Sequence, residues 1–87
     1  MKYDVDCARE ILRTLEAKES DCSMSFIELN NSLPTFSDKP CTVQYTCLKL
    51  EEAGYIKLAK KHMGTFVERI TDVTVSGHNW LNQQEKL

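Results

Sequence analysis

Cysteine and histidine are the residues of this chain best suited to bind a metal or to act as nucleophiles. The four cysteines form no Cys-x-x-Cys pair, and neither His62 nor His78 lies at a zinc-finger spacing from any of them. We therefore predict no metal site and no cofactor. The cysteines are expected to be small buried residues kept as free thiols. They are Cys7, Cys22, Cys41 and Cys47.

Ser76-Gly77-His78 is the stretch that most invites a catalytic interpretation. A nucleophilic serine of this kind needs a tight Gly-x-Ser-x-Gly turn, which does not surround Ser76. The sequence also lacks a glycine-rich phosphate-binding loop. We expect instead that Gly77 lets the last helix pack closely on a sheet and that His78 forms a local hydrogen bond. The sequence thus predicts that the protein is not an enzyme.

The charge of the chain does not by itself favour nucleic acid, because the net charge is −2 and the pI is about 5.6. Its distribution is uneven: residues 39–69 carry six basic and three acidic residues, net +3, which leaves −5 for the rest. No apolar run approaches the ~18 residues of a membrane span. The opening MKYDVDCARE carries acids where a signal peptide would be apolar. We therefore expect a cytoplasmic protein with no membrane partner.

The first half of the chain predicts two helices around a short strand. Asp4 is expected to cap the first helix. Its apolar stripe has spacings of three and four and consists of Val5, Ala8, Leu12 and Leu15, flanked by Cys7 and Ile11. Residues 22–26 predict a short edge strand. Ser25 and Glu28 then form a capping box for a helix from Phe26 to about Ser32, with Phe26, Leu29 and Ile27 as its candidate buried residues.

A third helix is predicted to begin at Lys39 or Pro40, since proline is tolerated in the first turn. Gly54 follows it where a left-handed residue commonly ends a helix. Its expected buried stripe is Val43, Cys47, Leu50 and Ala53.

The remaining segment predicts a hairpin and a last helix. Ile56 and Leu58 alternate with polar residues in the first strand, and TFVERIT supplies the second. Thr74 is expected to cap a helix that contains Trp80 and Leu81. The order is helix, short strand, helix, helix, hairpin, helix. This order predicts one winged helix-turn-helix domain over residues 1–87, in the α+β class but mainly α, with three helices, a small antiparallel wing and a C-terminal helix.

Two stretches resemble bacterial winged-helix regulators. TVQYTCLKLEEAGYI, residues 42–56, resembles their recognition helix and first wing strand, and ITDVTVSGHNWL, residues 70–81, resembles the pattern that opens their final helix. With the opening MKYDVDCAREIL, the whole chain is similar to the family called domain of unknown function 2513, common in bacterial chromosomes, phages and mobile elements. The chain departs from that family at Thr46, where histidine is frequent, and at Val73, Asn79 and Asn82.

The winged-helix resemblance implies duplex DNA binding in transcriptional control. Outward residues near the start of the second helix of a helix-turn-helix face base edges in the major groove. The candidates on this helix are Lys39, Thr42, Gln44, Tyr45 and Lys49. Thr46 is expected to be partly available for contact with DNA. The candidates on the wing are Lys57, Lys60, Lys61 and His62.

A protein-interaction module is the alternative, since winged helices are reused as docking domains and interfaces are enriched in aromatic residues and methionine. Leu48 favours it, because a DNA reader more often has a polar or basic residue there. Met63 and Trp80 are further candidate interface residues. A homodimer, which a DNA-binding domain of this size commonly needs for specificity, would be expected to form through the last helix.

Overall fold

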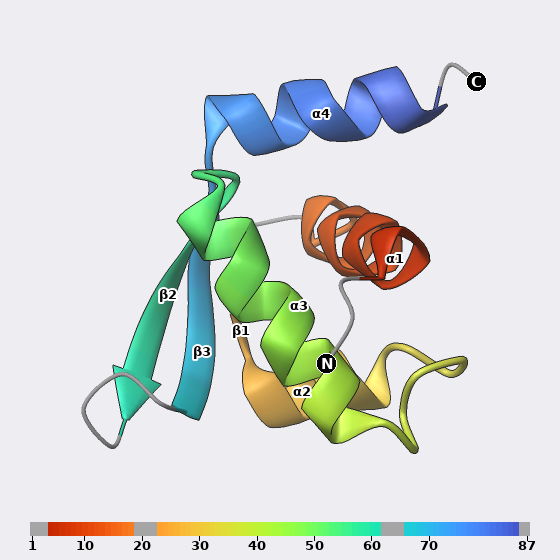
Figure 1. Ribbon diagram of the computed structural model, residues 1–87, viewed down its shortest axis with the longest axis vertical. Helices are drawn as coiled ribbons and strands as arrows, with labels where there is room; N and C mark the ends of the chain where they lie inside the picture. The colour runs from red at the N-terminus through yellow and green to blue at the C-terminus, as the bar shows by residue number, and fades with distance from the viewer. Residues whose placement is uncertain (1–3, 19–22, 62–65, 86–87) are drawn as a thin grey trace.

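The computed structural model describes residues 4–18, 23–61 and 66–85, which form four helices and a three-stranded sheet (Figure 1). Helix α1 (Val5–Glu16) begins where Asp4 accepts a hydrogen bond from the Cys7 backbone N–H at 3.1 Å. It buries Cys7, Ala8, Ile11, Leu12 and Leu15. The prediction that Val5 is buried is wrong: with Cys7 and Ile11 inside, Val5 falls at the edge of the stripe and is exposed.

Ser25 joins the first strand to the second helix. It is the last residue of β1 (Met24–Ser25), and its hydroxyl accepts a hydrogen bond from the backbone N–H of Glu28 in α2 (Phe26–Asn31). The predicted strand and helix cap are therefore confirmed. Ile27, expected inside, is exposed, because this short helix already turns Phe26 and Leu29 toward the core.

Helix α3 (Pro40–Glu52) begins at the predicted proline and ends before Gly54, whose φ of 82° confirms the left-handed position. Two predictions about its faces are wrong. Ala53 is exposed at the helix end, and Thr46 is fully buried rather than partly available. Burial of Thr46 is tolerated because its hydroxyl donates to the Thr42 carbonyl at 2.7 Å. The buried residues of α3 are Val43, Thr46, Cys47 and Leu50.

The sheet has the order β1-β3-β2 and is antiparallel throughout. Strands β2 (Ile56–Lys61) and β3 (Phe66–Val73) form the predicted hairpin, and among the described residues β1 pairs at Met24 with Ile70 and at Ser25 with Arg69. Ile56, Val67 and Ile70 turn into a core shared with α1, α2 and α3. Leu33 and Phe36 are buried and anchor the turn between α2 and α3.

Helix α4 (Val75–Glu85) runs across one end of the molecule and packs on α1 (Figure 1). Thr74 caps it as predicted, accepting from the Gly77 backbone N–H at 3.1 Å. The backbone N–H of His78 donates locally to the Thr74 carbonyl at 3.0 Å, but its side chain has a distant partner: Nδ1 pairs with the carboxylate of Glu16 at the end of α1. Sequence neighbours could not reveal this partner, because the fold alone brings the two helices together.

The order of helices and strands is the one predicted for a winged helix, so the α+β, mainly helical, winged-helix-like class is confirmed. The hairpin β2–β3 forms the wing beside α3, and α4 follows it (Figure 1). Among the described helices, none has both the length and the apolar character to cross a membrane.

Candidate functional site

Helix α3 lies across the molecule with one side uncovered, and the wing stands next to it (Figure 1). Thr42, Tyr45 and Lys49 follow one another at spacings of three and four, so they share one side of this open face, where each is half-buried. Gln44 is also half-buried but lies on the other side of the face, toward β3. Lys39 is exposed just before the first turn. The fold thus gathers the five predicted recognition residues along one helix.

Two of the predicted basic residues are paired with glutamates of α3. Lys49 donates to Glu52 at 3.1 Å, and this hydrogen bond raises the pKa of Lys49. Lys60, on the wing, donates to Glu51. The positive charge on this surface is therefore partly neutralised within the protein itself.

The wing residues are described only in part. Lys57 is exposed on β2. Lys61 is the last residue of β2, but its side chain lies outside the described part of the chain, as does the whole of His62. The hairpin nevertheless places β2, with Lys57 and Lys60, directly against α3.

The residues predicted to form a protein interface are less exposed than a docking function would require. Leu48 is half-buried and packs against the core. Trp80 is half-buried as well, and its ring stacks on Tyr55 with centroids 5.6 Å apart. Met63 lies outside the described residues. Leu48 and Trp80 therefore both bury part of their apolar surface inside the domain.

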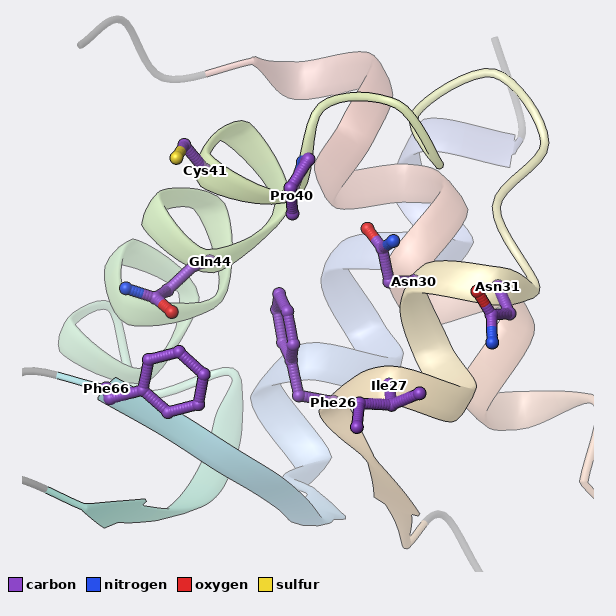
Figure 2. Close-up of a pocket in the computed structure, with 8 residues that line it drawn as sticks. All are labelled: Phe26, Ile27, Asn30, Asn31, Pro40, Cys41, Gln44 and Phe66. Atoms are coloured by element: carbon purple, nitrogen blue, oxygen red, sulfur yellow. The ribbon is translucent and has the colours of Figure 1, made fainter.

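An apolar groove of about 480 Å³ opens beside the first turns of α3 (Figure 2). We call it the α2–α3 groove. Phe26 stands between its two walls, one formed by α3 and the other by α2, and Phe66 of β3 closes one end (Figure 2). The residues that line it are Phe26, Ile27, Asn30, Asn31, Pro40, Cys41, Gln44 and Phe66.

Two side chains make this groove unusual for a protein surface. Ile27 is 74% exposed and Phe66 is 42% exposed, although Phe66 also meets Phe26 edge to face at 6.0 Å. Asn30 donates from its side chain to the Ser37 carbonyl at 3.1 Å and so links α2 to the turn before α3. Sequence reasoning missed the groove. The available signal was Phe26-Ile27 itself, since a helix that turns Phe26 and Leu29 toward the core turns Ile27 away from it.

The cysteines divide into two groups. Cys7 and Cys47 are buried free thiols, as expected, and burial raises the pKa of Cys7 to about 11 and raises that of Cys47 still further. Cys41 is exposed at the edge of the groove, so the expectation of burial is wrong for it: its place in the first turn turns it away from the core stripe. Cys22 lies outside the described residues. Within residues 4–18, 23–61 and 66–85, no three potential ligands gather as a metal site would require.

Comparison with protein families supplies the deciding observation about identity. A family model described as a hypothetical protein, DUF2513, matches residues 2–86. The chain belongs to the DUF2513 family. The match covers nearly the whole chain. The family resemblance recognised in the sequence is therefore confirmed over almost the full length of this DUF2513 protein. Comparisons with curated proteins and with solved structures find no match.

Proposed function

We propose that this DUF2513 protein is a winged helix-turn-helix protein that binds duplex DNA, with α3 in the major groove and the hairpin β2–β3 on the neighbouring backbone or minor groove. The observation that supports this most is the uncovered face of α3. It carries Thr42, Gln44 and Tyr45 near the start of the helix, where a recognition helix meets base edges.

Each residue type suits a distinct contact. The Gln44 amide can make a bidentate pair with adenine. Thr42, Tyr45 and Lys39 suit phosphate oxygens, which fix the position of a protein on the duplex without reading its sequence. On the wing, the candidates for backbone contacts remain Lys57, Lys60, Lys61 and His62.

The charge of this surface is compatible with the proposal. Helix α3 and strand β2 together carry four lysines and two glutamates, net +2, in a chain whose net charge is −2. The pairs Lys49–Glu52 and Lys60–Glu51 do not block DNA binding, because ion pairs at the surface are weakened by solvent screening and phosphates can replace the glutamates. We further propose that the protein acts in transcriptional control in the bacterial cytoplasm and is of phage or mobile-element type.

Fluorescence anisotropy of a labelled random-sequence duplex, titrated with the protein at low and at moderate salt, tests the proposal. We expect binding that weakens steeply with salt. The triple change of Lys57, Lys60 and Lys61 to alanine should weaken binding to every sequence and reduce the slope of log K against log salt by up to about 0.9 per lost phosphate contact. Absence of binding at low salt would contradict a DNA function.

Protein docking remains the second candidate, and the observation that favours it is the exposed apolar pair Ile27 and Phe66 beside α3. Such side chains suit an interface better than a phosphate backbone. Leu48→Asp is a poor test of docking, since Leu48 packs against the core and its change would also disturb the fold. Ile27→Asp tests docking without that complication.

A further inference from the structure

The ammonium group of Lys49 is held between two side chains of its own helix. Its Nζ lies 5.4 Å from the ring centroid of Tyr45, four residues earlier, and 3.1 Å from the Glu52 carboxylate, three residues later. Residues three and four apart are neighbours on a helix surface, so the three side chains stand in one row along α3. Lysine has a long, flexible side chain, and these two contacts fix where its charge lies before any partner arrives.

The two contacts respond differently to a DNA phosphate. Glu52 carries a negative charge and its side chain is 71% exposed, so a phosphate competes with it for Lys49. The face of an aromatic ring attracts a cation through its quadrupole but has no net charge. The Tyr45 ring therefore repels no phosphate. An ammonium that lies over the ring also keeps N–H groups on its other sides, where they can donate to a phosphate oxygen.

We propose that Tyr45 is a positioning residue for DNA binding: its ring holds the Lys49 ammonium where a phosphate takes the place of Glu52. This role rests on the proposed DNA-binding function and adds to it. The ring acts through Lys49, whereas a phosphate contact made by Tyr45 itself uses its hydroxyl. A lysine that is already held in place loses less side-chain freedom when it binds, and the number of phosphate contacts stays the same.

Nuclear magnetic resonance of the free protein tests the positioning contact without DNA. Methylene protons beside an ammonium that lies over a ring face resonate upfield, because the ring current shields them. We expect this shift at Lys49 in the wild type and in Tyr45→Phe, which keeps the ring. Tyr45→Leu should lose it. An unshifted Lys49 in the wild type overturns the proposal.

The anisotropy titration tests the role of the ring in binding. Tyr45→Leu should weaken binding of random-sequence duplex about two- to fivefold, the factor that corresponds to an exposed cation–π contact. The slope of log K against log salt should not change, because Lys49 still meets its phosphate. Lys49→Ala, by contrast, should reduce that slope by about 0.9, since it removes the phosphate contact itself. Tyr45→Phe should bind like the wild type, and a loss as large as that of Tyr45→Leu would overturn the proposal in favour of the hydroxyl.

A double-mutant cycle shows whether Tyr45 acts through Lys49. In a Lys49→Ala background, Tyr45→Leu should cause no further loss. In a Lys57→Ala background the full loss should remain, because Lys57 lies on β2 and serves as the matched control. The same loss in both backgrounds overturns the proposal. Circular dichroism melts verify that each variant is folded.

Failure of the proposed function and failure of this role give different results. A wild type that does not bind duplex at low salt contradicts the DNA function, and the positioning role falls with it. A wild type that binds duplex no more tightly than Tyr45→Leu overturns the positioning role alone and leaves the DNA function standing.

Discussion

The backbone carbonyl oxygen of Tyr55 occupies the space that a side chain at Gly77 would need: a Cβ at Gly77 would lie 2.2 Å from it. The same carbonyl accepts the backbone N–H of Thr74 at 3.0 Å. The first turn of α4 is thereby held directly against the backbone that leads from α3 into β2. Glycine is needed at position 77 for close approach, and not for an unusual backbone angle.

Replacing Gly77 by alanine should therefore destabilise the protein, because α4 must move away from the Tyr55 carbonyl to admit a methyl group. We expect a loss of ~1–3 kcal/mol in the free energy of unfolding, as for other overpacked sites. Urea denaturation followed by circular dichroism measures it. Ser76→Ala, one residue earlier and exposed, is the control and should change stability little. Equal stability of the two variants would contradict the close packing.

Stability should fall in alkaline solution because of the buried thiols. Burial holds the pKa of Cys7 at about 11 and that of Cys47 higher, against an ordinary value of 9.0. In the unfolded chain these thiols ionise from about pH 9, and ionisation favours the unfolded state. Their contribution is thus fully present below pH 9; for Cys7 it is lost as the pH rises through about 11, and for Cys47 the loss continues at higher pH.

The measurement is the free energy of unfolding as a function of pH for three proteins. The wild type and Cys41→Ala should lose stability with the same alkaline slope, since Cys41 is exposed. Cys47→Ala should be less stable at neutral pH, because it leaves a cavity, but its alkaline slope should be shallower. An unchanged slope in Cys47→Ala would show that other groups account for the alkaline loss.

Removing the glutamates that pair with lysines should strengthen DNA binding. Changing Glu51 and Glu52 to glutamine frees Lys60 and Lys49 for phosphates and removes two negative charges beside them. We expect tighter binding at low salt and a steeper dependence on salt, measured by the anisotropy titration.

The matched control is Asp6→Asn with Glu10→Gln on α1, which removes the same charge but breaks the ion pairs with Arg9 and Arg13 instead. This variant should gain less. An equal gain would mean that net charge alone, or a different surface, governs the binding.

Gln44 should affect which sequence is bound more than how tightly DNA in general is held. Loss of a bidentate amide–adenine pair costs ~1–3 kcal/mol of discrimination at one base pair. Sequence selection with Gln44→Ala should therefore relax the preference at one position, while affinity for random duplex changes little. Selection of the same sites by both proteins would show that Gln44 does not contribute to base recognition.

Sequence reasoning succeeded where the determinant is local. The caps at Asp4, Ser25 and Thr74 each involve a backbone N–H three residues along the chain, and Gly54 ends a helix whose pattern stops there. These features depend on residue type and spacing, which are visible in the sequence.

Sequence reasoning failed where the determinant is the packing of one helix or strand on another. The burial of Thr46 and the exposure of Ile27 depend on which face each helix turns to its neighbours, which only tertiary packing decides. The pair His78–Glu16 joins residues at opposite ends of the chain. The α2–α3 groove likewise needs three separate elements, so the Phe26-Ile27 pair could indicate an exposed apolar side chain but not the groove itself.

The double role of Ser25 has a consequence for the native-state dynamics of this protein. Helix α2 has six residues, too few to be stable in isolation, and its first turn is capped by a residue whose backbone pairs with Arg69. When the β1–β3 pairing opens, the cap is lost and α2 melts with it. Amide hydrogen exchange should therefore report α2 and the β1–β3 pairing as one cooperative unit, opening with a single free energy.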